Sequence, residues 1–252
     1  MKKIVKILYP PVVHFVLRMN FKEIDNPTIK TLKDISDKLS ETGYSEPTRI
    51  RLISSKGLDS EFSFVPLRFL SEEAGNEILI FRDSIYFQYN EKYPTWEKIL
   101  PNILENFFFL SEKLGFSLIE SISLDYIDLF DKFPQKGFKI DSYFNIHLKY
   151  PPELEMDYND FIIGIKLNTE DPNHKSILRI RGLKPINDEC YKIQLETHYS
   201  IKESINTSEK ERLNKNLNIS HINLLDNFKL VLSEKTKKII VMENGGDSEK
   251  NI

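Results

Sequence analysis

The fold is decided by residues 78–130, which read ILIFRDSIYFQYNEKYPTWEKILPNILENFFFLSEKLGFSLIESISLDYIDLF. Two β-rich runs precede a turn, and Thr95 then stands where a helix N-cap is favoured, with Glu97 in the first helical turn. Gly115 stands where such a helix would end, and an alternating strand pattern follows it. The pattern therefore predicts strands, a long helix and another strand.

The predicted helix has one wide apolar stripe. Its large apolar side chains recur every three or four residues, which is the period of an α-helix: Trp96, Ile99, Leu100, Ile103, Leu104, Phe107, Phe108 and Leu114. Burying one such side chain is worth roughly 1.5–3 kcal/mol. Because this much aromatic surface has to be buried, we expect the helix to lie on a sheet.

The residues before this stretch predict a strand, a helix and two further strands. Strict alternation over residues 13–22 is typical of a half-buried strand. Asn26 followed by Pro27 predicts a helix start, and Gly43 predicts its end. Strands are then expected at residues 49–53 and 62–70.

The second half of the chain is predicted to be mostly strand. The candidate strands are residues 143–150, 161–167, 177–183 and 191–199, and turn-rich stretches separate them. This spacing fits an antiparallel meander better than βαβ units. A polar stretch over residues 202–218 then leads to a last helix, for which Ser220 is the expected cap and Ile222, Leu225, Phe228, Leu232 and Ile239 the expected apolar stripe.

These elements predict an α+β fold, an extended and mostly antiparallel twisted sheet with three long helices packed on one face. Each half offers strands and closes with a long helix, so the two halves could be similar. We expect an N-terminal α+β half at residues 1–115 and a C-terminal β-meander with its closing helix at residues 116–243. The halves are expected to share one core, and residues 244–252 are expected to form a disordered tail.

Composition excludes several classes of protein. The 252 residues are 40% hydrophobic and 12% aromatic, which is typical of a globular chain. A formal net charge of −3 excludes a generally basic nucleic-acid-binding surface but leaves room for a local basic face. Cys190 is the single cysteine, so an intrachain disulfide and a thiolate metal cluster are excluded. With no membrane-length apolar run and a poor signal peptide, we expect a cytoplasmic protein that does not bind membranes.

Several stretches resemble a sporadically distributed prokaryotic protein family of similar length and unassigned activity. The stretches are Pro10-Pro11-Val12-Val13 at a strand start, Tyr93-Pro94-Thr95-Trp96 at a helix start, Leu124-Asp125-Tyr126-Ile127-Asp128 in a strand, and the closing helix over residues 223–242. The family more often has arginine and asparagine where this chain has Asp125 and Asp128. Its patchy distribution implies horizontal transfer, often among defence or toxin–antitoxin genes. The resemblance carries no catalytic residues.

No catalytic or metal-binding signature is present in the sequence. The five histidines lack helical i,i+4 spacing and zinc-ligand spacing with Cys190, and no glycine-rich phosphate loop or serine elbow occurs. Asp125 and Asp128 have opposite parity on a strand, so they are expected to point to opposite faces. A calcium-loop-like alternation at residues 153–159 has Tyr158 where glycine is required. We therefore predict no metal site and no cofactor.

A basic face is the strongest candidate for a binding site. Polar and basic residues take the same phase on the predicted strands of the second half, and the candidates are His147, Lys149, Lys166, Arg179, Arg181 and Lys192. If these strands are neighbours, one face of the sheet carries a patch that could bind phosphates or an acidic protein surface. The alternative is an ordinary solvated face, and Glu196 already dilutes its charge.

Our first functional hypothesis is a non-catalytic binding or regulatory protein, an accessory or antitoxin-like component of a prokaryotic defence locus. It would contact a protein partner through the open sheet face. The alternatives are nucleic-acid binding by the same basic face and a nuclease-type enzyme whose site the sequence does not reveal. A homo-oligomeric scaffold is the remaining hypothesis.

Overall fold

The structure is a computed structural model that describes residues 12–50, 64–90, 94–134, 138–147, 161–183 and 190–238. Several sequence features named above lie wholly outside these residues. They include Pro10-Pro11, Tyr93, Lys149, Ile239, the calcium-like stretch at 153–159 and the tail at 244–252, and the strands expected at 49–53, 62–70 and 143–150 are described only in part.

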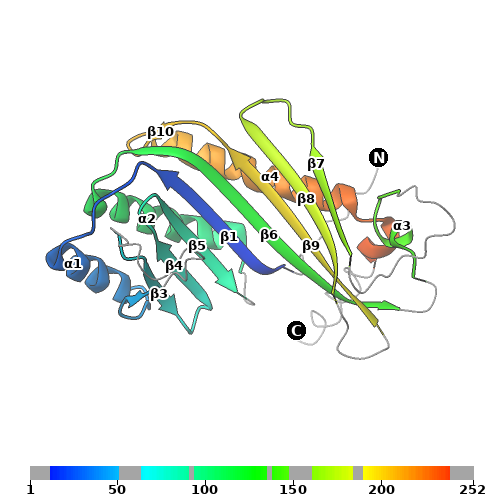
Figure 1. Ribbon diagram of the computed structural model, residues 1–252, viewed down its shortest axis with the longest axis horizontal. Helices are drawn as coiled ribbons and strands as arrows, with labels where there is room; N and C mark the ends of the chain where they lie inside the picture. The colour runs from blue at the N-terminus through cyan, green and yellow to red at the C-terminus, as the bar shows by residue number, and fades with distance from the viewer. Residues whose placement is uncertain are drawn as a thin grey trace, which may run out of the picture.

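One antiparallel sheet dominates the described part of the chain (Figure 1). Its ten strands are β1 (Val12–Phe21), β2 (Thr48–Arg49), β3 (Leu67–Ser71), β4 (Asn76–Ile80), β5 (Ser84–Asn90), β6 (Leu118–Pro134), β7 (Ile162–Leu167), β8 (His174–Leu183), β9 (Cys190–Ile201) and β10 (Ile205–Asn206). The strand order is β2-β3-β4-β5-β1-β6-β9-β8-β7, and β10 pairs with β6 outside this path. The prediction of an α+β fold with an extended antiparallel sheet is confirmed.

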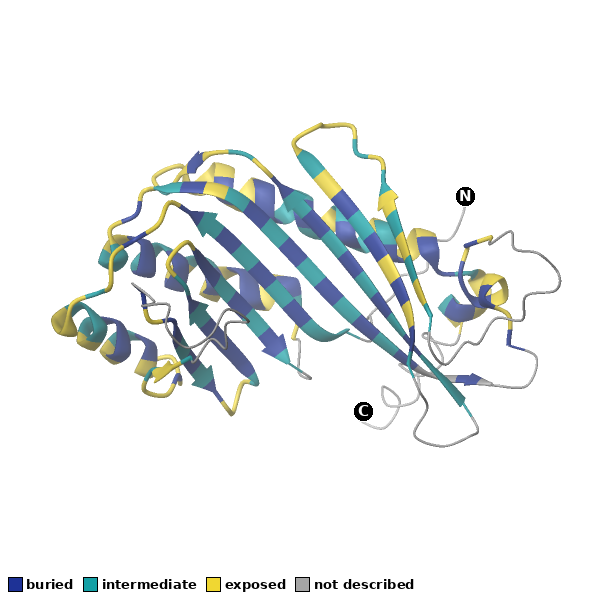
Figure 2. Ribbon diagram, in the orientation of Figure 1, coloured by how far each residue is buried: buried dark blue, intermediate teal, exposed yellow. Residues whose placement is uncertain are grey.

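The named helices that accompany these strands are α1 (Ile29–Ser40), α2 (Trp96–Leu114), α3 (Ile140–Tyr143) and α4 (Lys210–Val231), and residues 234–238 are also helical. The three long ones pack on a single face of the sheet, as predicted, because their buried side chains share a core with one parity of strand residues. We call this side the covered face and the opposite side the open face. Figure 2 shows the resulting alternation of buried and half-buried residues along each central strand.

The helix that the sequence predicted most strongly forms as expected. In α2 the buried residues include Trp96, Ile103 and Phe107, which belong to the predicted stripe. Gly115 closes the helix with φ 77°, a left-handed conformation that costs glycine little because it has no Cβ. Thr95 occupies the N-cap position, but its side chain makes no capping hydrogen bond.

Buried apolar side chains form two clusters on the covered face. The larger one joins α1, α2 and the first part of α4 to the strands around β1. The smaller one joins Phe130, Phe144 and Phe228 to β8 and β9. Along β6 the boundary falls between Tyr126, which belongs to the larger cluster, and Phe130, which belongs to the smaller.

Strand order is the same on both sides of the β1–β6 pair. On one side β1 lies next to β5, and β4 and β3 follow. On the other side β6 lies next to β9, and β8 and β7 follow. The two sides differ in that β2 extends the first series beyond β3 and β10 pairs with β6 outside the second, so the similarity of the two halves stays a prediction.

The start of the last helix was predicted wrongly. α4 begins at Lys210, within the polar stretch at residues 202–218 that was expected to precede the helix. Its buried stripe includes Leu213, Leu217 and Leu224, whereas the predicted stripe residue Ile222 is exposed. Ser220 is buried inside the helix, where its hydroxyl donates to the carbonyl of Asn216 (3.0 Å), as serines within helices often do.

The strand predicted at residues 143–150 does not form in its described part. Residues Ile140–Tyr143 make one helical turn, and Phe144 forms an isolated bridge with Leu232. Phe144 and Ile146 are both buried in the smaller cluster, and this produces the alternating pattern without a strand. The pattern was therefore a packing signal from an irregular segment.

The first helix starts two residues later than predicted. Thr28 is the N-cap of α1, and its hydroxyl accepts a hydrogen bond from the amide of Thr31 (3.1 Å). The side chain of the predicted cap, Asn26, instead accepts a hydrogen bond from the amide of Val65 (3.0 Å). Asn26 thus ties the helix start to the segment that leads into β3.

Candidate binding face

The open face is defined by the strand residues that alternate with the core. On the central strands these include Arg18 on β1, Asp125 on β6 and His198 on β9. Each lies between neighbours of the core parity, such as Leu17, Leu124 and Thr197, that are buried on the covered face. In the part of the chain that the structure describes, no long helix lies on this side of the sheet, so the open face is a broad surface built from several strands.

Four of the six predicted binding residues lie together on this face. On β8, Arg179 pairs with Gly164 of β7 and Glu196 of β9, and Arg181 pairs with Ile162 and Gln194. Lys166 pairs with Ile177, and Lys192 pairs with Leu183. Since neighbouring strands lie about 4.8 Å apart and alternate residues about 7 Å apart, these cations form one patch. We call Lys166, Arg179, Arg181 and Lys192 the basic patch.

The other two predicted residues do not join this patch. His147 is exposed and follows the irregular segment around Phe144, away from any described strand. It was assigned to the face because the sequence predicted a strand there, and that strand is absent from the described residues 143–147. Lys149 lies outside the described residues.

The basic patch is only partly neutralised. Arg179 donates to Glu196 (2.7 Å), and the two side chains are 48% and 26% exposed. An ion pair this exposed contributes roughly 0–1 kcal/mol, so it orients Arg179 more than it stabilises the fold. Within the described ranges, Lys166, Arg181 and Lys192 form no ion pair. The patch therefore keeps a positive excess on a chain of formal charge −3.

An Asp–His pair lies near the patch, toward the centre of the sheet. The Nδ1 atom of His198 is 2.6 Å from Oδ1 of Asp125 on the neighbouring strand. The aspartate thus holds one ring nitrogen of the histidine by a hydrogen bond, which orients the ring on the open face. Sequence reasoning missed this pair because it depends on the register between β6 and β9, although both residues have the parity of the open face.

Arg18 and Asn20 place further polar atoms at the centre of the open face. The guanidinium of Arg18 lies over the ring of Tyr86, 5.1 Å from its centroid. Asn20 donates to the hydroxyl of Ser121 (2.8 Å). Nε of Arg18 and Oδ1 of Asn20 are buried and have no hydrogen-bond partner among the described residues. The centre of this face is thus polar and incompletely hydrogen-bonded.

Asp125 and Asp128 point to opposite faces, as predicted. Asp125 faces His198 on the open face, whereas Asp128 is 1% exposed among the core-parity residues of β6. Burial raises the pKa of Asp128 well above its ordinary value. Its Oδ1 and the hydroxyl of Thr197 are buried, and no described residue forms a hydrogen bond with either. These two carboxylates cannot converge on a shared metal ion.

The Trp96 side chain links both halves of the chain on the covered face. Its indole Nε1 donates to Asn218 of α4 (2.8 Å), and its ring stacks on His221 with centroids 4.6 Å apart. Nδ1 of His221 is 2.9 Å from the hydroxyl oxygen of Tyr126 on β6. Burial lowers the pKa of His221 to about 4, so the ring is neutral at pH 7. The Trp96 end of the Tyr-Pro-x-Trp stretch is therefore structural.

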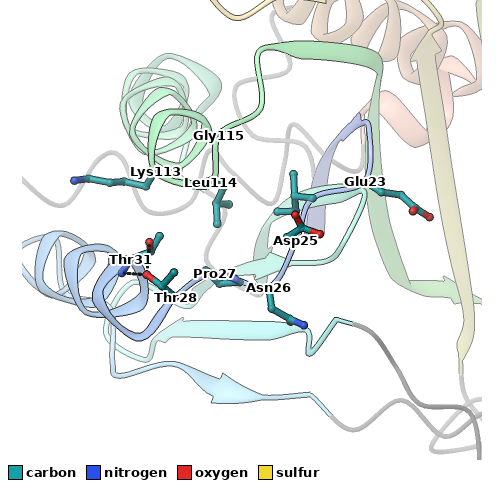
Figure 3. A pocket seen from close by; sticks show the side chains of 10 residues that line it. Glu23, Asp25, Asn26, Pro27, Thr28, Thr31, Lys113, Leu114 and Gly115 are labelled. Atoms are coloured by element: carbon teal, nitrogen blue, oxygen red, sulfur yellow. Dashed lines mark hydrogen bonds between the residues drawn. The ribbon is translucent and has the colours of Figure 1, made fainter.

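A polar pocket of about 350 Å³ lies where the start of α1 meets the end of α2 (Figure 3). Most of its charged side chains are already paired. Glu23 forms an ion pair with Arg82 (2.9 Å), and Lys113 forms one with Asp34 (3.1 Å). The hydroxyl of Thr28 caps α1. With these groups engaged, the pocket presents no convergent set of catalytic groups.

Two searches of the described residues bear on other site types. No group of three or more histidine, cysteine, aspartate or glutamate side chains in the described ranges could hold a metal ion. None of the helices in the described part of the chain is both long and apolar enough to cross a membrane.

Comparison of the chain with protein-family models and with curated proteins gives no match. The resemblance to a sporadically distributed prokaryotic family therefore stays a prediction.

Proposed function

We propose that this chain is a non-catalytic binding protein that contacts an acidic surface of a protein partner through its open face. The basic patch is the observation that carries the proposal. Lys166, Arg179, Arg181 and Lys192 gather on three neighbouring strands, and one carboxylate, Glu196, is paired within the patch. Such a local positive excess complements a negative partner surface and speeds encounter with it.

The shape of the open face supports a macromolecular partner. The polar side chains are spread over β1, β6, β8 and β9 instead of converging in a cleft. A standard protein–protein interface takes about 800 Å² from each partner, which a sheet of this width can supply. An accessory or antitoxin-like role, the setting that the family resemblance implies, suits a protein that acts by contact.

Nucleic-acid binding by the same patch is the second candidate. The patch is positively charged although the whole chain has a formal net charge of −3, and a local positive charge can also attract phosphates. Phosphate contacts release counterions, so binding by this route falls steeply with salt, with a log–log slope close to the number of phosphates neutralised. An acidic protein surface with a buried apolar centre gives a shallower salt dependence.

The test is an affinity capture from the native host with wild-type protein and with Arg179→Glu/Arg181→Glu, each with and without nuclease. The matched control is Lys30→Glu/Lys33→Glu, which makes the same charge change at exposed positions of α1, away from the open face. We expect one protein to survive nuclease treatment with the wild type and the control and to be lost with the arginine variant. Recovery of nucleic acid instead supports the second candidate. Equal recovery by all three proteins contradicts both.

A further inference from the structure

The outer edge of β7 is the feature that points beyond the proposed function. β7 is the last strand of the sheet order, and no described residue pairs with its outer side. At the other end of the sheet the last strand, β2, has only two residues, whereas β7 has six. Short edge strands are one way in which proteins prevent unwanted pairing, and β7 lacks that protection.

The hydrogen-bond register shows which backbone groups of β7 face outward. The carbonyl of Phe161 accepts a hydrogen bond from the amide of Gly182 (3.0 Å), so the odd-numbered residues of this segment face β8. In an antiparallel pair the alternate residues direct both N–H and C=O away from that neighbour. Ile162, Gly164 and Lys166 therefore present their backbone groups at the free edge. No hydrogen bond from any described residue satisfies these groups.

The side chains of these same residues lie on the open face, beside the basic patch. Ile162 is 61% exposed and pairs with Arg181, while Gly164 pairs with Arg179. A Cβ at Gly164 would meet nothing within 4 Å, so the space above this glycine is empty. A carboxylate on a strand added opposite Gly164 would have an unobstructed path across it toward Arg179.

We propose that the partner adds an extended segment antiparallel to the free edge of β7, with acidic side chains at alternating positions on the open face. Main-chain hydrogen bonds to Ile162, Gly164 and Lys166 would hold the segment, and the basic patch would select its charge. This inference rests on the proposed function and names the class of its partner.

Charge complementarity selects this occupant over a second copy of the chain. Two β7 edges paired with each other would bring together two sets of Lys166, Arg179 and Arg181 on the same face. Like charges on adjacent strands are destabilising. An acidic segment meets the same cations with the opposite sign, so the edge favours a partner of different sequence.

The direct test uses a capped peptide, Val-Glu-Val-Glu-Val-Glu-Val, with the intact protein. Hydrogen exchange of backbone amides is followed by NMR. We expect the peptide to slow exchange at Ile162, Gly164 and Lys166, with little change at Ile163 and Ile165, whose amides already face β8. Protection that is uniform over the strand, or absent from these three amides, overturns the inference. Protection that needs no peptide and rises with protein concentration assigns the edge to a second copy and overturns it too.

Two N-methylated peptides separate strand addition from simple charge attraction. Methylation of the three glutamate amides removes the donors that would face β7, whereas methylation of valine amides, which would point away, preserves them. We expect the first peptide to bind about tenfold more weakly or worse and the second to bind like the parent. Equal binding by all three peptides means that charge alone drives the contact and contradicts strand addition.

A backbone variant keeps this test distinct from that of the proposed function. Gly164→Pro removes an outward N–H without removing an inward one, and Gly164→Val is its matched control, which fits the empty space and keeps the N–H. Circular dichroism first checks that both variants are folded. We then expect Gly164→Pro to lose the native partner and Gly164→Val to retain it. If Gly164→Pro retains a partner that Arg179→Glu/Arg181→Glu loses, strand addition is wrong and the proposed function stands. If the arginine variant retains it, the proposed function itself fails.

Discussion

The two faces of this sheet use charged and polar residues in opposite ways. On the covered face, Trp96 and His221 stack on each other and form hydrogen bonds. Other polar groups on this face, such as Asp128, are buried from solvent. On the open face, Lys166 and Arg181 have no ion-pair partner among the described residues. The covered face therefore holds the groups that determine stability, and the open face is the one that the proposed function uses for binding. Substitutions on the two faces should therefore affect different measurements.

The largest effect on stability is expected at Trp96. Trp96→Ala removes a buried indole, its stacking on His221 and its hydrogen bond to Asn218, and should lower the free energy of unfolding by about 3–5 kcal/mol. Urea denaturation measures this change. Trp96→Phe is the control, because it keeps an aromatic ring in place and loses the indole hydrogen bond, so a smaller loss is expected. A loss below about 1 kcal/mol for the alanine variant would contradict the assignment of this residue to the core.

Asp128 should make stability depend on pH in the opposite sense to most carboxyl groups. Burial raises the folded-state pKa of Asp128, so the neutral carboxyl group favours the folded state. This contribution to the free energy of unfolding is complete below the unfolded-state pKa, near 4, and is lost as the pH rises from there toward the folded-state pKa. The loss is at most about 1.4 kcal/mol per pH unit until the folded pKa is reached. Urea titrations of wild type and Asp128→Asn at several pH values isolate this contribution. The advantage of the variant should grow with pH, and parallel curves would show that Asp128 does not titrate differently in the folded state.

His221 gives a smaller dependence in an acidic window. Its folded-state pKa of about 4 lies below the ordinary value of 6.5, so the neutral ring favours the fold above pH 6.5. Stability should fall as pH drops from 6.5 to 4 and change little further below that range. His221→Phe keeps a ring against Trp96 but does not titrate, so its curve should lack this slope. NMR titration of the wild-type imidazole gives an independent check, and a pKa near 6.5 would contradict the burial of the ring.

The smallest effect on stability is expected from the basic patch. Arg179→Glu/Arg181→Glu breaks an exposed ion pair and should change the free energy of unfolding by no more than about 0.5 kcal/mol beyond that of Lys30→Glu/Lys33→Glu. Thermal unfolding of both variants measures this difference. A strongly destabilised arginine variant would mean that these residues support the fold, and the separation between the two faces would fail.

The sequence predicts best where one physical signal dominates. The stripe around Trp96 and the glycine at 115 specify α2, because the apolar period and a residue suited to φ 77° agree. The start of α4 was missed because only one narrow leucine stripe runs through an asparagine- and lysine-rich stretch. A local signal existed, since Asn206 accepts from Ser208 (2.9 Å) and Glu209 accepts from Asn206 (2.9 Å) just before the helix.

The candidate site depended on information that the sequence does not contain. Parity alone placed Lys166, Arg179, Arg181 and Lys192 on one face, but their proximity follows from the pairing of β7 with β8 and β8 with β9. The pair of Asp125 and His198 likewise needs the register between β6 and β9, because the two residues are 73 positions apart in sequence. The prediction that His147 lies on this face was wrong, because the alternating pattern around it comes from burial of its neighbours in an irregular segment. Register and strand order are tertiary properties, so single-strand patterns could not supply them.

The most direct test of the separation between the two faces measures stability and partner binding on the same preparations. Wild type, Arg179→Glu/Arg181→Glu and Lys30→Glu/Lys33→Glu are unfolded in urea, and each is used for affinity capture after nuclease treatment. We predict three nearly equal unfolding curves and a protein partner that only the arginine variant fails to capture. Capture of the same partner by the arginine variant with unchanged stability would contradict the assignment of binding to the open face.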